Sequence, residues 1–308
     1  MISILLASYN GEKYIKEQMD SLLEQTKQNF KLYICDDKST DNTYNIVKEY
    51  ASRYPEKIFV SQNEKNLGGA KNNFIKMMTE HKDDYVMLCD QDDIWLPDKI
   101  EKSLLKIKEL ENRFGKNKPL LVHTNLCITD ENLKITSHSY WDKVNTKVEE
   151  KKFNKVLVQN FAAGCTVIYN RALGSLINTE PEYLIMHDWW LLLLASAFGE
   201  IDMIDKPTIL YRQHTGNAFG TNKRGVVSHF SHKLFNSKEI KDTLGETYRQ
   251  AGSFLSVYKD SLSGVNLELL TAYASVPRVS KLKKWKILFR YRTWKNGYIR
   301  KIAQLIFI

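Results

Sequence analysis

The stretch that decides the fold is Leu88–Asp98, LCDQDDIWLPD, in which an apolar run ends abruptly in acidic residues. Three carboxylates, Asp90, Asp92 and Asp93, occupy four positions directly after the apolar segment 85–89. Carboxylates this close repel one another, and burial disfavours their charged forms unless a cation compensates. The stretch therefore indicates a buried strand that ends at a site for a positively charged group.

Similar segments alternate along the first 112 residues, where apolar runs are followed by turn residues and then by helical patterns. Strands are predicted over 2–7, 30–35, 57–61 and 85–89, and helices over 13–24 and 97–112. Apolar strands separated by helices predict an α/β fold with a Rossmann-like, mostly parallel central sheet flanked by helices. Ligands bind beyond the carboxyl ends of such strands, where Tyr9-Asn10, Asp36-Asp37 and Asp90–Asp93 fall.

The rest of the chain is less regular. Strands are predicted over 120–125, 164–170 and 207–213, a helix over 187–198, and a mobile loop over 216–225. Beyond that loop the pattern is helical. We therefore predict a first domain over 1–220, with a nucleotide-binding half (about 1–112) and an acceptor-binding half (113–220), and a helical C-terminal region over 221–308.

The positive charge of the chain is concentrated in its last segment. The net charge is +9, and residues 278–308 hold ten Lys and Arg with no Asp or Glu, so the rest of the chain is close to neutral. Aromatic and aliphatic residues alternate with these cations, a pattern typical of helices that lie on anionic membrane surfaces. Packing against the body of the protein and nucleic-acid binding are the alternatives, and we expect no nucleic acid as partner.

Cysteine usage and hydropathy point to a cytoplasmic protein. Cys35, Cys89, Cys127 and Cys165 lie far apart in apolar segments, without the spacing of a zinc site, and are expected to be buried free thiols. The N-terminus does not resemble a signal peptide, and the longest apolar run, 189–198, is about half of what a membrane-spanning helix needs. We expect peripheral attachment to the inner face of the plasma membrane through the basic tail.

The acidic turns carry the first candidate site. Asp90 and Asp92 are alternate residues at the end of a strand, so both side chains can point at one place in space. Mg²⁺ or Mn²⁺ typically uses one or two carboxylates as ligands. Asp93 is assigned to capping the helix that follows. Asp36-Asp37 could accept hydrogen bonds from a base or ribose, although turn chemistry explains the pair equally well.

Two later segments add candidates. Asp188 opens an apolar helix, where an acidic residue is most often a cap, but beside Trp189 and Trp190 it could remove a proton from a sugar hydroxyl. Arg212 and His214 end a strand before a polar loop, and a lid carrying them could cover a diphosphate. A plain surface loop is the alternative there.

Together these motifs resemble a known family. The segments ILLASYNGEKYI, ICDDKSTDNT, NLGGAKNNF, DQDDIWLPDK, MHDWW and YRQHTGN, in this order, resemble a bacterial family-2 glycosyltransferase over about residues 1–220. The set is most similar to rhamnosyltransferases that build rhamnose-containing cell-surface polysaccharides. The resemblance implies the GT-A type of α/β fold.

The resemblance also implies a donor site. Ala7, Tyr9 and Asp37 would hold the nucleobase, with Asp37 on its imide N–H. Lys71 would lie near the nucleotide, and Asp90 would contact the ribose. The family often has Thr or Ser where Ala7 stands, so only backbone contact is expected at that position.

The remaining roles implied by the resemblance concern the reaction. Asp92 would bind Mg²⁺ or Mn²⁺ on the donor diphosphate, with Asp90 and His214 as further candidate ligands. Asp188 would be the catalytic base, and Arg212 and His214 would belong to a closing loop that contacts the donor.

The implied reaction is inverting sugar transfer. L-Rhamnose from dTDP-β-L-rhamnose is the favoured donor sugar, and the acceptor would be a lipid-linked oligosaccharide or growing polysaccharide. The same fold with a UDP-hexose donor is the nearest alternative, and a non-catalytic membrane-surface binding protein is a more distant one. A sugar nucleotidyltransferase would need a Gly-rich loop with Arg or Lys after the first strand, which Ser8–Gly11 does not provide.

Overall fold

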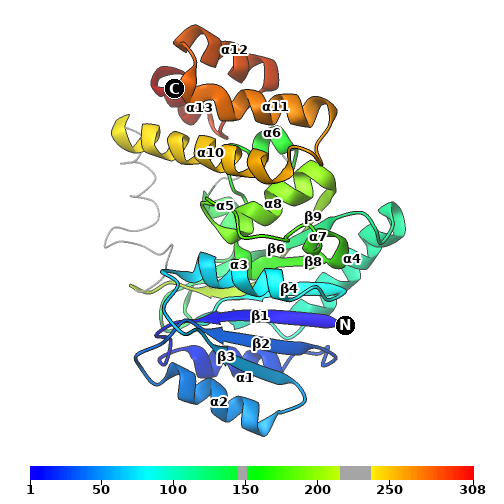
Figure 1. The fold of residues 1–308 in the computed structure, drawn as a ribbon. Helices are drawn as coiled ribbons and strands as arrows, with labels where there is room; N and C mark the ends of the chain where they lie inside the picture. The colour runs from blue at the N-terminus through cyan, green and yellow to red at the C-terminus, as the bar shows by residue number, and fades with distance from the viewer. Residues whose placement is uncertain (145–150, 216–236) are drawn as a thin grey trace.

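The strands predicted in the first 112 residues form one parallel set in the computed structural model of the protein (Figure 1). The structure describes residues 1–144, 151–215 and 237–308. The elements of this first part are β1 (Ile2–Ser8), α1 (Ile15–Leu23), β2 (Lys31–Asp36), α2 (Thr43–Arg53), β3 (Ile58–Gln62), α3 (Ala70–Glu80), β4 (Tyr85–Cys89), β5 (Ile94–Trp95) and α4 (Lys99–Phe114).

The middle of the chain completes the sheet. Its elements are β6 (Leu120–Thr129), β7 (Ile135–Ser137), α5 (Tyr140–Val144), α6 (Phe153–Val156), the 3₁₀ turn η1 (Gly164–Thr166), β8 (Val167–Asn170), α7 (Arg171–Gly174), α8 (His187–Phe198) and β9 (Glu200–Arg212). The described residues form a nine-stranded sheet of order β3-β2-β1-β4-β8-β6-β9-β5, with β7 paired to β6. Most strands share one direction, whereas β8, β5 and β7 run against their neighbours.

Several boundaries differ from the sequence-based prediction. The strand expected over 120–125 runs to Thr129, and the strand expected from Gly164 begins at Val167 after a 3₁₀ turn. Two further differences have a clear cause in backbone pairing. The helix expected from Pro97 begins at Lys99. The Leu96 N–H donates to the Thr208 carbonyl, so the chain up to Leu96 is still paired with β9. The strand expected from Pro207 begins at Glu200, because its polar first half pairs with the fully buried strand β6. Backbone pairing sets both boundaries.

Alternating residues of the strands face two hydrophobic layers. Ile4 and Leu6 of β1 join the cluster beneath α1, α2 and α4, whereas Leu5 and Ala7 join the cluster beneath α3 and α8. This alternation follows from the period of two in an extended strand. Both faces of the central sheet are therefore covered, as the continuous apolar strands predicted.

Helix α8 connects the sheet to the C-terminal helices. It is apolar all round, and a helix of that kind is buried on every side. In Figure 1 it lies between the sheet and the upper layer of helices, and Trp190 meets Phe254 edge-on with ring centroids 5.1 Å apart. The C-terminal region thus shares one core with the half of the first domain over 113–220.

The C-terminal region is helical, as predicted. Its described elements are α10 (Ser237–Tyr258), α11 (Gly264–Ser275), the 3₁₀ turn η2 (Val276–Arg278), α12 (Lys281–Tyr291) and α13 (Tyr298–Phe307). The predicted domain boundary at 220–221 and the loop predicted over 216–225 lie outside the described residues, and the boundary stays a prediction. Among the described helices, none combines the length and the apolar character needed to cross a bilayer.

The basic tail packs on the body with one face and exposes another. Ile287 and Leu288 of α12 are buried, and the Trp285 indole donates to the Leu305 carbonyl at 3.1 Å. Both α12 and α13 also carry large apolar side chains that are at least 40% exposed: Leu282, Phe289, Tyr298, Ile299, Ile302 and Ile306. Packing and an unpartnered apolar surface therefore occur together.

Candidate active site

The carboxyl ends of β1, β2 and β4 lie at one edge of the sheet. Ser8 at the end of β1 pairs in register with Asp36 of β2, and Leu6 pairs with Cys89 of β4. The polar turns that follow these three strands therefore converge, which confirms the arrangement expected from the sequence.

Asp36 organises the turn after β2. It is fully buried, and its carboxylate accepts hydrogen bonds from the Ser8 hydroxyl at 3.1 Å, from the Ser39 N–H and from the Gln62 amide at 2.9 Å each. The Ser39 hydroxyl donates to it as well. Both of its oxygens are occupied within the protein, which is the turn role that the sequence left open.

Asp37 is arranged differently from its neighbour. Its Oδ1 accepts from the Asn63 amide at 2.8 Å and from the Leu67 N–H at 2.9 Å. Its Oδ2 is buried without a hydrogen-bond partner among the described residues. A buried acceptor left unpaired is costly and uncommon, so this oxygen is suited to an N–H group of a ligand.

Gln91 fixes the loop after β1 to the loop after β4. The Tyr9 N–H donates to Gln91 Oε1 at 2.9 Å, and Gln91 Nε2 donates to the Tyr9 carbonyl at 2.9 Å. A side chain at Gly11 would overlap that of Gln91. These two hydrogen bonds hold Tyr9, which is 46% exposed, close to the buried Ala7. The sequence analysis did not identify this role of Gln91.

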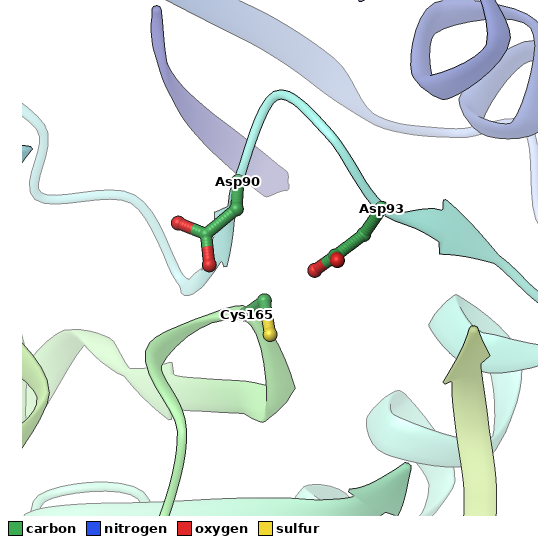
Figure 2. Close-up of side chains that lie close together, drawn as sticks. All are labelled: Asp90, Asp93 and Cys165. Carbon is green, nitrogen blue, oxygen red and sulfur yellow. The ribbon is translucent and has the colours of Figure 1, made fainter. Parts of the chain in front are cut away.

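Asp90, Asp93 and Cys165 form a cluster. Figure 2 shows the two carboxylates on the loop that links β4 to β5, with the thiol approaching from η1. One ligand atom from each residue lies within 4.8 Å of the others. Cys165 was expected only as a buried thiol. Its place in this cluster depends on β8 running antiparallel to β4 and β6, a direction that the sequence pattern did not indicate.

Burial and mutual repulsion keep protons in this cluster. Burial, together with the charges of Asp92 and Asp188, raises the pKa of Asp90 to about 7. Burial and the charges of Asp92 and Asp90 raise the pKa of Asp93 well above its usual range. The Cys165 thiol also has its pKa raised well above the usual value, chiefly by burial, so it stays protonated. The cluster is electrostatically incomplete without a cation.

Asp92 and His214 meet at the open side of the cluster. His214 Nε2 lies 2.8 Å from Asp92 Oδ2, with the two side chains 13% and 14% exposed. The His214 ring also packs against Tyr14 at a centroid distance of 4.5 Å. The structure thus brings together the two residues that the sequence assigned to metal and diphosphate binding.

The prediction that Asp93 caps the following helix is wrong. The residue at the N-cap of α4 is Asp98, and Asp93 Oδ1 instead accepts from the Arg212 N–H at 3.1 Å. Its other oxygen is buried and has no hydrogen-bond partner among the described residues. The cap was misplaced because the residues after Asp93 pair with β9 before the helix begins.

Arg212 is the last residue of β9 and is 3% exposed. Its guanidinium donates to the Asp92 carbonyl at 3.0 Å and to the Glu131 carbonyl at 2.9 Å, and it forms an ion pair with Glu17. It also stacks 4.6 Å over the Tyr14 ring. These contacts hold the backbone of the turn after β4 in place. Arg212 is therefore the buried end of strand β9 and is not part of a surface loop.

Asp188 lies in the first turn of α8, with Met186 at the N-cap position. It is 7% exposed, and its Oδ1 accepts from the Trp189 N–H at 2.6 Å. Burial raises its pKa to about 6, against hydrogen bonds from Trp189, Asn160 and Gly164 that lower it. Its charge acts on Asp90, so the Asp188 carboxylate lies near the acidic cluster.

Lys71 and His187 are tied to neighbouring elements. Lys71 Nζ donates to the Leu184 carbonyl at 3.2 Å and so links α3 to the segment before α8. His187 is buried against Phe74, and this burial lowers its pKa to about 3. His187 is therefore a neutral core residue.

Lys99 lies beneath the cluster and was missed by the sequence analysis. It is fully buried, its ammonium lies 4.5 Å above the Trp95 ring, and burial lowers its pKa to about 8. Asp93, Cys89 and Cys165 act on its charge. A signal existed in the sequence: Lys99 and Ser103 share one helix face with the apolar stripe of α4.

Known proteins show which family shares these features. Residues 3–118 match the family model described as Glycosyl transferase family 2. The dTDP-rhamnosyl transferase RfbG of Shigella flexneri is 31% identical over 228 residues, which cover 70% of this chain and 74% of that protein. The UDP-Glc:alpha-D-GlcNAc-diphosphoundecaprenol beta-1,3-glucosyltransferase WfgD of Escherichia coli is 30% identical over 201 residues, 63% of this chain and 70% of that protein.

A solved structure shares the fold over nearly the whole chain. S. aureus TarS 1–349 in complex with UDP-GlcNAc superposes with a TM-score of 0.56, covering 99% of this chain and 90% of that one, at 17% sequence identity. The predicted fold class is therefore confirmed, including the helical C-terminal region.

Proposed function

The chain belongs to glycosyl transferase family 2 and is a transferase with a GT-A fold, and from this premise we propose the following reaction. It moves a sugar, with inversion, from a nucleotide sugar to a hydroxyl of a lipid-linked or growing cell-surface glycan. The observation that carries the proposal is the buried carboxylate Asp188, with a pKa of about 6, beside the acidic turn of Asp90 and Asp92.

The donor nucleotide is assigned to the turns after β1 and β2. The free Oδ2 of Asp37 suits the imide N–H of a thymine or uracil base. The exposed ring of Tyr9 would stack on that base, while Ala7 contributes backbone only. Asp90 would accept from the ribose, and Lys71 would line the same side.

A divalent metal fits the open side of the cluster. Mg²⁺ and Mn²⁺ prefer carboxylate oxygen, and Mn²⁺ accepts imidazole as well, so Asp92, with Asp90 and His214 as candidate partners, would hold it. Burial and the neighbouring carboxylates raise the pKa of Asp90, and a bound cation would lower it again. Cys165 stays a thiol and is not assigned as a ligand. When bound, the metal supplies positive charge to the leaving diphosphate.

Asp188 would act as the base. Its carboxylate takes the proton of the acceptor hydroxyl, whose oxygen attacks the anomeric carbon while the bond from that carbon to the diphosphate oxygen breaks. The nucleoside diphosphate leaves with the bonding electron pair, and the product has inverted configuration. Activity is therefore expected to rise with pH through about 6, where Asp188 becomes a carboxylate.

The test of this role is Asp188→Asn. The amide keeps the size of the side chain but cannot accept a proton, so transfer should fall at least about 1,000-fold while donor affinity stays within about twofold. Asp205→Asn, at an exposed aspartate of β9, is the matched control and should behave like the wild type. A fully active Asp188→Asn enzyme would remove the assignment.

The favoured donor is dTDP-β-L-rhamnose. The similarity to RfbG supports it, whereas the similarity to WfgD supports the alternative of a UDP-hexose. Initial rates with dTDP-rhamnose, UDP-glucose, UDP-galactose, UDP-N-acetylglucosamine and GDP-mannose separate the two. Preference for a UDP-hexose would keep the mechanism and replace the donor.

We assign the exposed face of α12 and α13 to the anionic inner surface of the plasma membrane. Exposed apolar residues such as Ile299 and Ile302 lie among the cations of the tail, which match negatively charged lipid headgroups. Replacing Ile299 and Ile302 with Ser should reduce sedimentation with phosphatidylglycerol vesicles. Leu105→Ser, 63% exposed on α4, is the control, and equal sedimentation of both variants would contradict the assignment.

A further inference from the structure

A second polar site lies where the acceptor-binding half meets the C-terminal helices. A cleft of about 540 Å³ opens between α6, the junction of α8 and β9, and the facing ends of α11 and α12. Its lining residues are Lys151, Lys152, Phe153, Asn154, Ser196, Gly199, Glu200, Ile201, Val265, Asn266, Leu269, Arg290, Tyr291 and Arg292.

The cleft is separate from the candidate active site. Ser196 and Gly199 lie at the C-terminal end of α8, whereas Asp188 lies in its first turn. At 1.5 Å per residue, the length of this helix is about 18 Å. A nucleotide sugar held by the β4 turn therefore cannot place its diphosphate in the cleft.

The cleft carries an excess of positive charge. Four of its lining residues are Lys or Arg, and one, Glu200, is acidic. Lys151 is bound to Asp202 at 2.7 Å, and Arg290 is paired loosely with Glu268 at 3.6 Å. These two cations are therefore already partly neutralised.

Lys152 and Arg292 are the cations left for a ligand. Over residues 1–144, 151–215 and 237–308, neither side chain has an ion-pair partner. A guanidinium and an ammonium in one cleft form a common arrangement for phosphate, to which the guanidinium fork can donate two parallel hydrogen bonds.

Arg292 is held in an unfavourable backbone conformation at this cleft. Its φ and ψ are 53° and 39°, the left-handed region, where glycine is the residue without strain. Asn154 Nδ2 holds the end of α12 by donating to the carbonyls of Tyr291 at 2.9 Å and Arg292 at 3.2 Å. An arginine at a position that favours glycine adds about 1 kcal/mol of strain.

We propose that this cleft is a phosphate-binding site, in which Arg292 and Lys152 hold a phosphate or diphosphate group. The group belongs either to a lipid, as a headgroup or as the diphosphate of a lipid-carried acceptor, or to a soluble phosphate compound. The lipid-carried acceptor as a source rests on the proposed function; the phosphate site itself does not. Val265, 70% exposed at the rim, offers apolar contact to a lipid.

The first test is calorimetric titration with inorganic pyrophosphate in the presence of a chelator. Arg292→Gly removes the guanidinium and relieves the backbone, so it should lower the affinity at least about tenfold while leaving the melting temperature equal or higher. Lys152→Gln should lower the affinity as well. Lys108→Gln, an exposed lysine of α4, is the matched control and should bind like the wild type.

The site is overturned if the wild type binds no pyrophosphate, or if Arg292→Gly and Lys152→Gln bind it as the wild type does. The Asp92→Ala variant separates this inference from the proposed function, because it should lose transfer and keep pyrophosphate binding. Pyrophosphate binding lost in Asp92→Ala but kept in Arg292→Gly would place the anion in the active site and overturn the assignment.

A second measurement identifies the source of the phosphate. The full chain is sedimented with phosphatidylcholine vesicles that contain phosphatidic acid, with and without pyrophosphate. Binding that Arg292→Gly weakens, that Lys108→Gln retains and that pyrophosphate inhibits would support the lipid source. Vesicle binding that is equal in all variants, alongside pyrophosphate binding lost in Arg292→Gly, would support a soluble phosphate compound.

Discussion

The two acidic turns, after β2 and after β4, look alike in sequence and differ in structure. Asp36 has both oxygens occupied by donors from the protein. Asp90, in contrast, lies beside two other carboxylates, and its pKa is raised to about 7. An acidic residue at a strand end thus has a structural role where donors of the chain occupy both of its oxygens, and holds its proton more tightly where burial and like charges surround it.

Removing a carboxylate of the second turn is expected to have the largest effect on activity. Asp92→Ala should reduce transfer about 1,000-fold, because it removes the proposed metal ligand that supports the leaving diphosphate. Steady-state rates with saturating Mn²⁺ measure it. Asp98→Ala, an aspartate six residues on that pairs with Lys102 on the surface, should remain active, and equal losses in both would break the distinction.

Removing a carboxylate of the first turn should affect folding instead. Asp36→Ala leaves the Ser39 N–H and the Gln62 amide without their acceptor, so the free energy of unfolding should fall by about 2–3 kcal/mol. Urea denaturation measures it, with Asp92→Ala expected within about 1 kcal/mol of the wild type. If Asp36→Ala retained full stability, the first turn would not be held by this residue.

The smallest expected effect has the opposite sign. Burial raises the pKa of Asp90 above its unfolded value, so the folded state binds its proton more tightly and its carboxylate form opposes folding as pH rises. Asp90→Asn should therefore stabilise the metal-free protein by about 1–2 kcal/mol at pH 8. The gain should disappear as pH falls below about 4, where both states of the wild type become protonated. A destabilised Asp90→Asn variant at pH 8 would contradict the raised pKa.

The sequence predicted the elements whose pattern is local. The apolar runs and turn residues placed β1 to β4 within one or two residues, and the ends of these strands located Asp37, Asp90 and Asp92. The same reasoning could not find Gln91 or Cys165. Gln91 forms two hydrogen bonds with the backbone of Tyr9, and Cys165 reaches Asp90 and Asp93 because β8 is antiparallel. Both contacts join residues more than 70 positions apart in the chain.

Arg212 and Lys99 show a second limit of sequence reasoning. Charged residues are read as exposed by default, yet Arg212 is buried among carbonyls and a carboxylate, and Lys99 lies against Trp95. Burial of such groups depends on partners that tertiary structure supplies. The role predicted for Asp93 was wrong for the same reason, because its hydrogen-bond partner Arg212 is 119 residues away in the chain.

The most direct measurement is the binding of dTDP-rhamnose to the wild type and to Asp92→Ala, with Mn²⁺ and then with a chelator. We expect wild-type binding that needs Mn²⁺ and that Asp92→Ala loses, since we propose that the second acidic turn binds a cation and, through it, the diphosphate. Nucleotide-sugar binding that is equally tight in the chelator and in Asp92→Ala would contradict this account. It would mean that the carboxylates after β4 have another purpose.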